Sequence, residues 1–430
     1  MSGVDAMALF LQVERARARG DWVWLQAAGP GAEAGLRRAQ AALASSPCPE
    51  GGGVVLASGG SSGGRSFCLQ PWSHLDASAS ACAGWLQAIG LDPSDLLLLN
   101  PLPPHHVSGL MPWWRSRCWG AAHAVLPPAW MKQPEQLMQA CRGLGDWGRK
   151  PALVSLVPTQ LQRLMAHPAG ADWLQALAVV WVGGAALPRV VAEEARQRGI
   201  RLAPCYGATE TAAMVAAQTP ERFLRGDSGC GAPLADVDLR VEVDGSLQVK
   251  TPRLAPLRWR HDHWAPLVDA QGWWRTGDAA ELRDDAVSAP RLQLMGRMDG
   301  AIQSGGETVF PEQLSERLLE QAQARGLAVQ AVLLLPVPST EWGARLVALV
   351  RCADTPKTPD DWRLLLSRLQ EITAGWLPAE RPQTWQSCPD LDVSDAGKWQ
   401  RARWQAWWHS QESAQSYRSD ARAVRYGDQQ

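Results

Sequence analysis

The sequence predicts an α/β protein with a large multi-layer N-terminal domain, which includes a small β unit, and a small α+β C-terminal domain. From about residue 54 to 295, apolar strand-like runs alternate with helical segments, a pattern typical of layered and largely parallel sheets. Alternating residues on both sides of Asp244-Gly245 predict an antiparallel hairpin. After residue 300 the mixture of helices and strands resumes, and a chain of 430 residues is long enough to form more than one core.

The elements can be predicted in order from the spacing of apolar residues. Residues 8–44, including Trp22 and Trp24, have the spacing of short helices and end in a Gly/Pro/Ser-rich stretch near residue 53. Further strands are expected over 54–56, 95–100, 122–127, 176–184, 200–207, 329–337 and 344–350, and further helices over 159–166, 188–198, 311–325 and 360–373.

Composition excludes several classes of protein. The 42 Lys and Arg residues balance 43 Asp and Glu residues, so no basic surface for nucleic acid is expected. No apolar run approaches eighteen residues, so we expect no transmembrane segment. The N-terminal residues do not resemble a signal peptide. The nine scattered cysteines include no C-x-x-C pair, which argues against a disulfide framework or a zinc site and favours the cytoplasm.

Lysine is scarce in this chain. The only lysines are Lys132, Lys150, Lys250, Lys357 and Lys398, and arginine is used at the other basic positions. A second skew is that tryptophan is much more abundant than tyrosine or phenylalanine. A bias toward GC-rich codons accounts for both skews. Each remaining lysine is nevertheless a candidate for a task that arginine performs poorly.

A glycine-rich segment follows the strand predicted at 54–56. Backbone N–H groups and hydroxyls in such a loop can surround phosphate oxygens. Considered alone, the segment has three possible interpretations. It fits the phosphate loop of a P-loop NTPase, with Arg65 in place of the Walker lysine, or the nucleotide loop of an adenylate-forming enzyme. It also fits a flexible linker. The candidate phosphate-binding residues are Ser58, Gly60, Ser61, Ser62, Gly63 and Arg65.

Four further motifs follow this loop in a fixed order, and their joint occurrence by chance is very improbable. They are Tyr206-Gly207-Ala208-Thr209-Glu210, then Arg275-Thr276-Gly277-Asp278, then Gly296-Arg297-Met298-Asp299 with Ser304-Gly305-Gly306-Glu307, and finally Gly397-Lys398.

With these motifs, the chain resembles the acyl-CoA synthetase and adenylate-forming superfamily from about residue 54 to 405. Among its branches it is most similar to the o-succinylbenzoate–CoA ligases of menaquinone and phylloquinone biosynthesis. The segments that suggest this branch begin at Leu102, Ser155 and Val182 and read LPPHHVSG, SLVPTQL and VGGAALP.

The resemblance implies the adenylate-forming enzyme fold and an AMP-forming acid–CoA ligase that uses ATP, Mg²⁺ and CoA. A carboxylate would attack the α-phosphate of ATP to give an acyl-adenylate, and the thiol of CoA would then displace AMP. A CoA ligase for another aryl or medium-chain acid and a degenerate family member that binds an acyl-adenylate without turnover remain alternatives. A P-loop NTPase is disfavoured by the segment around Glu210.

The resemblance also assigns roles to individual residues. Lys398 would bridge the attacking carboxylate and the α-phosphate, a position that suits a compact ammonium. Glu210 would bind Mg²⁺, Thr209 the α-phosphate, and His106 would lie beside the acyl and pantetheine pockets. Other expected contacts are Gly183, Gly184, Ala185, Tyr206 and Gly207 with the nucleotide, Asp278 and Arg297 with the ribose, Thr159 and Gln160 with the acid, and Gly305 and Gly306 with the pantetheine channel.

The same resemblance predicts the domain organisation. An AMP-binding domain would span residues 1–298 and a mobile C-terminal domain 299–410, with Asp299 as the hinge and a polar tail over 411–430. The glycine-rich loop begins unusually early, so residues 1–53 are expected to form a reduced N-terminal subdomain. The loop also lacks the usual Pro-Lys pair, and Arg65-Ser66 stands there instead. Either a monomer or a homodimer is compatible with the sequence.

Overall fold

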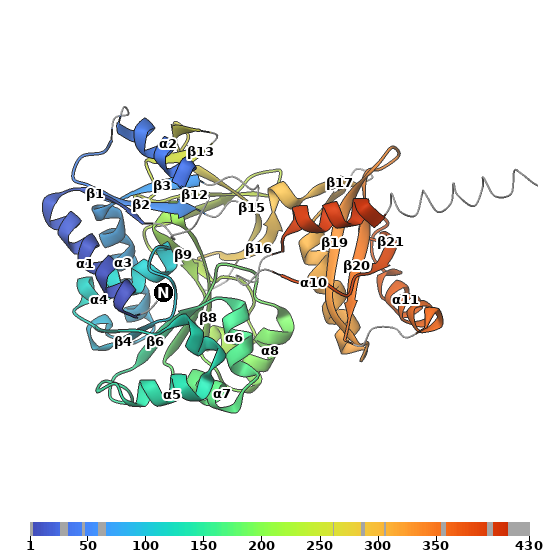
Figure 1. The fold of residues 1–430 in the computed structure, drawn as a ribbon, viewed down its shortest axis with the longest axis horizontal. Coiled ribbons are helices and arrows are strands. Elements are labelled where there is room, and N and C mark those ends of the chain that lie inside the picture. Colours follow the sequence, from blue (N-terminus) through green and yellow to red (C-terminus); the bar gives the residue numbers. More distant parts are fainter. Residues whose placement is uncertain are drawn as a thin grey trace, which may run out of the picture. The chain divides into compact units, whose positions relative to one another are not determined.

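The computed structural model consists of two units, Met1–Met295 and Gly296–Gln430 (Figure 1). It describes residues 3–25, 33–44, 48–58, 66–260, 262–284, 289–304, 307–353, 358–393 and 399–411. Strand β16 (Arg291–Arg297) carries the chain from the first unit into the second. No helix in the described ranges is long and apolar enough to cross a membrane.

A seven-stranded sheet forms the centre of the first unit, in the order β10-β9-β8-β7-β6-β4-β5. Strands β4 to β8 are parallel to one another, as the alternation of strands and helices predicts, whereas β9 and β10 are antiparallel additions. The strands are β4 (Leu97–Asn100), β5 (Ala122–Val125), β6 (Ala152–Leu156), β7 (Val179–Val182), β8 (Leu202–Ala208), β9 (Ala213–Ala217) and β10 (Ala232–Pro233).

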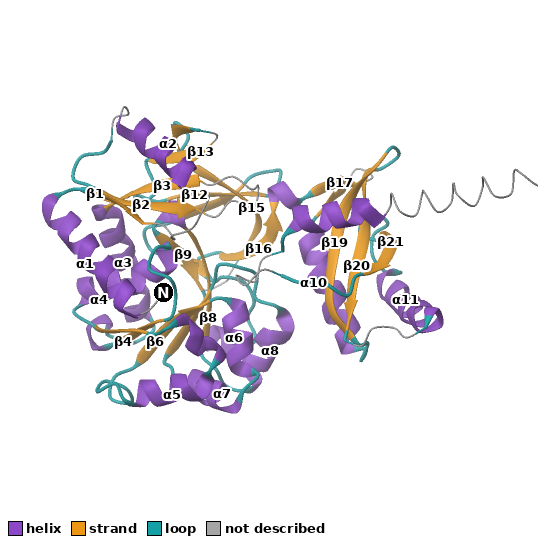
Figure 2. Ribbon diagram, in the orientation of Figure 1, coloured by secondary structure: helices purple, strands orange, loops and turns teal. Residues whose placement is uncertain are grey.

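Apolar layers cover both faces of this sheet. Figure 2 shows helices gathered on one side of this sheet, where their apolar residues join those of β4, β6 and β7 in one core cluster. The other side packs on helix α3 and on a separate antiparallel sheet. The helices are α3 (Trp72–Ala88), α4 (Val107–Trp119), α5 (Pro134–Arg142), α6 (Pro158–Met165), α7 (Pro168–Gln175), α8 (Arg189–Gln197) and α9 (Pro220–Leu224).

A second sheet, in the order β1-β2-β3-β13-β14, contains the N-terminal residues. The helical prediction for the region around Trp22 and Trp24 is wrong, because β1 (Trp22–Leu25) pairs in parallel with β2 and alternates between partly buried and buried residues. The prediction of helices on either side of β1 is confirmed. The elements are α1 (Gly3–Arg19), α2 (Glu33–Ala44), β2 (Gly53–Ser58), β3 (Ser66–Pro71), β13 (Leu257–Arg260) and β14 (His263–Pro266).

A third sheet has the order β11-β12-β15-β16. Its strands β11 (Asp238–Val241) and β12 (Ser246–Lys250) form the predicted hairpin, and the turn holds Gly245 at a φ of 81°. Strand β15 (Trp274–Arg283) pairs with β12, which confirms a small antiparallel β unit in this region.

The second unit is an α+β unit with an antiparallel core, to which β21 adds in parallel along β20. Helices α10 and α11 pack on one face, and tryptophans of the helix at 401–411 pack on the other. The elements are β17 (Ile302–Ser304), β18 (Glu307–Val309), α10 (Pro311–Ala324), β19 (Val329–Ser339), β20 (Gly343–Cys352), α11 (Pro359–Thr373) and β21 (Pro382–Ser387).

Candidate active site

Several of the predicted site residues lie in segments that leave the same edge of the seven-stranded sheet. Strands β4, β6, β7 and β8 are parallel neighbours, so their carboxyl ends lie side by side (Figure 1). Ligands of α/β proteins commonly bind at this edge. The segments that follow these strands carry, in turn, His106, then Thr159 and Gln160 at the start of a helix, then Gly183 to Ala185, and finally Thr209 and Glu210 in a short 3₁₀ helix.

The turn that presents Thr209 and Glu210 has a constrained backbone. A short 3₁₀ helix, Thr209–Thr211, is followed by Ala212 and Ala213 at φ values of 49° and 88°, a region that non-glycine residues rarely occupy. Gly207 lies directly beneath this turn, and a Cβ atom there would come within 2.3 Å of the Ala213 carbonyl oxygen. Such backbone geometry persists only where the surrounding structure enforces it.

Hydrogen bonds from distant elements hold this turn in place. The buried Gln70 amide donates to the Thr209 carbonyl at 2.6 Å, and Ser78 donates to the Ala212 carbonyl at 2.6 Å. The amide of Ala255 donates to the Glu210 carbonyl at 2.8 Å. Sequence reasoning missed Gln70 and Ser78, since neither belongs to a motif and both act across more than a hundred residues of chain.

A buried arginine completes the support of the turn. Arg253 is fully buried, pairs with Asp236 at 2.6 Å, and donates to the carbonyls of Thr211 and Met214. Breaking a buried pair of this kind is strongly destabilising, because it leaves an uncompensated charge in the interior. The sequence contains a weak signal of this role, a single arginine in the otherwise uncharged run TPRLAP.

The buried carboxylate of Glu210 lies at the end of the glycine-rich segment. Ser58 Oγ donates a hydrogen bond to Glu210 Oε1 at 2.7 Å, and Arg258 Nη1 lies 3.7 Å from the same oxygen. Ser58 and Glu210 come from motifs 152 residues apart, and the fold brings them into contact. Gly60, Ser61, Ser62, Gly63 and Arg65 lie outside the described residues.

Tyr206 and Asp278 form a second contact between separate motifs. The Tyr206 hydroxyl donates to Asp278 Oδ2 at 2.5 Å. Burial, together with the negative charge of Asp278, raises the pKa of Tyr206 well above its usual value, so the hydroxyl keeps its proton. Asp278 is fixed further because its backbone amide donates to Thr276 Oγ1, and that hydroxyl donates to the Leu247 carbonyl.

The segment after β7 consists of small residues at the carboxyl edge of the sheet. Gly183 lies on Cys205, and a Cβ atom there would come within 3.0 Å of the Cys205 sulfur. Gly184 has a φ of 81°, which glycine adopts readily. Gly184 and Ala185 are exposed.

The predicted acid-binding residues lie at the first turn of α6. The Thr159 hydroxyl is buried and has no hydrogen-bond partner among the described residues. The Gln160 side-chain oxygen accepts from the Val157 amide at 3.1 Å and thereby caps the helix. His106 is exposed at the start of α4, and its ring lies 4.4 Å from that of His105.

The other predicted residues belong to the second unit. Arg297 ends β16, and Asp299 lies in the 3₁₀ helix Met298–Gly300 that follows. The side chain of Asp299, the residues Gly305, Gly306 and Lys398, and the tail from 412 lie outside the described part of the chain.

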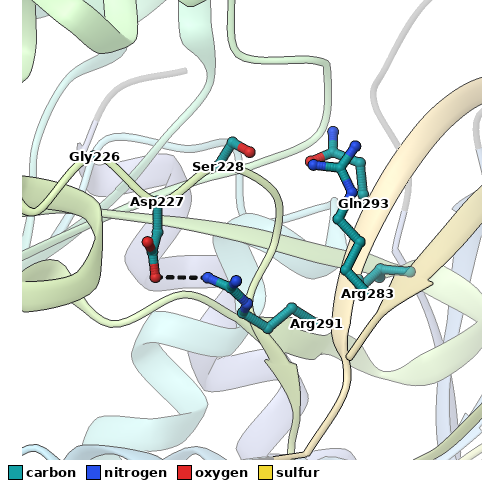
Figure 3. A pocket seen from close by; sticks show the side chains of 7 residues that line it. Gly226, Asp227, Ser228, Arg283, Arg291 and Gln293 are labelled. Carbon is teal, nitrogen blue, oxygen red and sulfur yellow. Dashed lines mark hydrogen bonds and ion pairs between the residues drawn. The ribbon is translucent and has the colours of Figure 1, made fainter. Parts of the chain in front are cut away.

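A small pocket elsewhere in the first unit is separate from these residues. It measures about 200 Å³ and is lined by the 226–228 loop and by β15 and β16, with an ion pair of 2.6 Å between Asp227 and Arg291 (Figure 3). That volume is below the range usual for small-molecule sites. None of the residues predicted for catalysis lines it.

Comparisons with known sequences support the motif assignment. Residues 71–253 match the family model of the AMP-binding enzymes. The chain is 35% identical over 275 residues to the 2-succinylbenzoate–CoA ligase of Salmonella typhimurium, a match that covers 64% of this chain and 53% of the relative. It is 32% identical over 294 residues to the Escherichia coli enzyme of the same name, covering 68% and 58%. The chain thus matches little more than half the length of these relatives.

Solved structures give a consistent result. Wild-type E. coli MenE with a bound analogue of OSB-AMS superimposes with a TM-score of 0.60 at 27% identity, covering 83% of this chain and 69% of that one. MenE from Bacillus subtilis, in complex with the acyl-adenylate intermediate OSB-AMP, has a TM-score of 0.65 at 21% identity and covers 81% and 68%. The resemblance and the fold class predicted from the sequence are confirmed.

Proposed function

We propose that this chain, which resembles adenylate-forming enzymes in sequence and fold, is an ATP-dependent acid–CoA ligase. Its substrate would be o-succinylbenzoate and its product o-succinylbenzoyl-CoA, formed through an acyl-adenylate in phylloquinone or menaquinone biosynthesis. The observation that carries the proposal is the convergence of separate motifs on the segment from Tyr206 to Glu210, through the Ser58–Glu210 and Tyr206–Asp278 contacts. The names of the matched relatives support the choice of acid.

The described residues suit the binding of a nucleotide. Asp278, held by Tyr206 and Thr276, offers a carboxylate that accepts hydrogen bonds from the ribose hydroxyls. The small residues after β7 allow the adenine ring to approach the backbone. Thr209 begins the fixed turn, where its hydroxyl can donate to an α-phosphate oxygen.

Glu210 also suits a hard divalent cation. Its buried carboxylate accepts a hydrogen bond from the Ser58 hydroxyl, and Mg²⁺ prefers such oxygen donors and takes few of them when phosphates supply the rest. When bound, Mg²⁺ would neutralise charge on the phosphates. A solved B. subtilis MenE contains ATP and a magnesium ion, although at 20% identity that likeness extends to the fold alone.

In the first half-reaction a carboxylate oxygen of the acid attacks the α-phosphorus and pyrophosphate leaves. Lys398 would contribute its ammonium where negative charge accumulates. In the second half-reaction the CoA sulfur attacks the acyl carbon and AMP leaves, with Gly305 and Gly306 beside the pantetheine. Movement of residues 299–410 about Asp299 would alternate the two arrangements.

Thr159 is the described residue that best supports an acid pocket. A buried hydroxyl without a protein partner is energetically costly unless a ligand or water satisfies it, and the hydroxyl lies at the same sheet edge as Glu210. Gln160 would shape the pocket, with its oxygen occupied in capping α6. His106 would line the path toward CoA.

Incubation of the full chain with ATP, Mg²⁺, CoA and a panel of carboxylic acids tests the proposal. Release of AMP and pyrophosphate with o-succinylbenzoate, and formation of the corresponding thioester detected by mass spectrometry, are the expected results. Turnover only with another aryl or medium-chain acid would establish a different ligase. Release of ADP would contradict the ligase mechanism, and tight binding of an acyl-adenylate analogue without any turnover would identify a degenerate binder.

We expect the enzyme in the cytoplasm, where thiols stay reduced, because all nine cysteines are free. Whether it acts as a monomer or a homodimer is decided by light scattering of the purified chain.

A further inference from the structure

Arg258 is the one arginine that pairs with the Glu210 carboxylate among the described residues. Its Nη1 atom lies 3.7 Å from Glu210 Oε1, which is too long for a hydrogen bond, while Ser58 bonds the same oxygen at 2.7 Å. The Arg258 side chain is 26% exposed and that of Glu210 is 8% exposed. Arg258 is therefore close to the carboxylate, and part of its side chain is accessible from solvent.

The sheet places Arg258 at the base of the glycine-rich segment. Ser58 and Ser66, which precede and follow residues 59–65, are paired across β2 and β3, and the Ser66 hydroxyl donates to the Ser58 carbonyl. Cys68 of β3 is in turn paired with Arg258 of β13. Paired residues, and residues two apart on one strand, share a face of the sheet. Ser58, Ser66 and Arg258 therefore face the same side.

That side is the one occupied by the Glu210 turn. Leu56, which is paired with Cys68, packs in one core cluster with Ala212 of the turn, whereas Phe67 and Trp259 pack in a different cluster with α2 on the opposite face. The site residues Ser58 and Glu210 thus have a guanidinium beside them that comes from β13, 200 residues after Ser58 in the chain.

The charges at this position favour a phosphate ligand. The glycine-rich segment contains no lysine, and ATP would bring several negative charges against Glu210. A guanidinium donates two parallel hydrogen bonds to phosphate oxygens and stays protonated at all working pH values. We propose, on the basis of the proposed function, that Arg258 binds the β- or γ-phosphate of ATP and follows it to pyrophosphate. Without nucleotide, Arg258 rests against Glu210.

Direct binding measurements on the full chain separate this role from general support of the site. Isothermal titration with Mg²⁺-ATP, pyrophosphate and AMP, without any acid, would be carried out on wild type, Arg258→Ala and Arg258→Lys. Arg258→Ala should weaken ATP and pyrophosphate by about 10- to 100-fold, since it removes hydrogen bonds to a charged group. AMP lacks both phosphates, so its affinity should stay at the wild-type level.

Arg225→Ala is the matched control, because Arg225 is an exposed arginine that pairs with Glu221 at the surface. It should bind all three ligands as wild type does. If Arg258→Ala does not fold, as circular dichroism would reveal, Arg258→Lys carries the test. It keeps the charge but loses the planar fork, so it should show a smaller loss for ATP and pyrophosphate and none for AMP.

Equal weakening of ATP and AMP, or unchanged binding of ATP and pyrophosphate, would overturn the role of Arg258. The proposed function fails in a different way, when wild type itself binds neither ATP nor AMP, or releases ADP. A wild type that forms acyl-adenylate normally while Arg258→Ala binds ATP normally would refute the inference and leave the ligase proposal intact.

Discussion

The hydroxyl of Tyr206 donates a 2.5 Å hydrogen bond to the carboxylate of Asp278, which joins the end of β8 to β15. Because burial and the Asp278 charge raise the pKa of Tyr206, the hydroxyl remains a donor across the working pH range. The bond leaves Asp278 with a fixed orientation. Tyr206 and Asp278 belong to two separate motifs that are both predicted to contact the nucleotide, and this bond joins them.

Tyr206→Phe should therefore impair nucleotide binding more than chemistry. Loss of one hydrogen bond to a carboxylate should raise the KM for ATP by about 3- to 10-fold with little change in kcat. Initial rates over a range of ATP concentrations measure both constants. A kcat that falls while the KM for ATP stays constant would show that the tyrosine acts on the chemical step instead.

Gly207→Ala tests the close approach beneath the Thr209–Glu210 turn. The added Cβ atom would lie 2.3 Å from the Ala213 carbonyl oxygen, so the turn must shift. We expect a loss of about 1–3 kcal/mol in the free energy of unfolding, together with a large loss of activity. Thermal unfolding and the AMP-release assay measure these two effects.

Gly84→Ala is the control, and we expect it to have the opposite effect on stability. Gly84 lies inside α3 and is exposed, and nothing lies within 4 Å of a Cβ atom there. Alanine should stabilise the helix by about 0.5–1 kcal/mol and leave activity unchanged. If both glycine variants behave alike, the steric explanation for Gly207 is wrong.

Three partly or fully buried histidines predict a loss of stability in acid. Burial lowers the pKa values of His74, His105 and His123 from 6.5 to about 4. Between those two pH values the unfolded chain binds protons that the folded chain does not, so the stability present above pH 6.5 is lost as the pH falls toward 4. Melting temperatures measured at several pH values between 7.5 and 4.5 should decline accordingly.

His74→Asn isolates one contribution to this decline. His74 contacts the Gln70 side chain at 3.2 Å, and Gln70 in turn holds the Thr209 carbonyl. The variant should show a shallower loss of melting temperature between pH 6.5 and 4.5. A His74 variant with an unchanged slope would refute the contribution of this histidine.

The parallel sheet, the hairpin at Asp244-Gly245 and most helices follow from local patterns, since hydrophobic periodicity reflects which face of an element is buried. The strand β1 could not be predicted this way. Trp22, Trp24 and Leu25 fit a helix as well as a strand, and the decision depends on pairing with β2, about 30 residues away.

The candidate site likewise contains residues that the sequence predicts and residues that it does not. Motif order predicted Ser58, Glu210 and Tyr206 as site residues, because the motifs of the resembled family specify both the kind of residue and the order of the segments. Gln70, Arg253 and Arg258 carry no motif, and their contacts arise only when distant strands meet. Residues that support a turn through long-range hydrogen bonds are therefore visible in the structure and hidden in a single sequence.

Lys398→Ala tests the residue on which the two half-reactions should differ most. The ammonium is expected to stabilise the charge that builds up during attack on the α-phosphate, so the rate of acyl-adenylate formation should fall by about 10²–10³-fold. Thiolation of supplied acyl-adenylate by CoA should be little changed, because under the proposed mechanism Lys398 acts only in the first half-reaction. Pyrophosphate release and thioester formation measure the half-reactions separately.

Lys150→Ala is the matched lysine control. Its Nζ atom is 4.0 Å from Asp95 in an ion pair at the protein surface, a type of contact that contributes little. It should leave both half-reactions at the wild-type rate. A Lys398 variant that loses both half-reactions equally would indicate a role in folding or nucleotide binding, since a charge acting only in adenylation cannot slow the attack of CoA on a preformed adenylate.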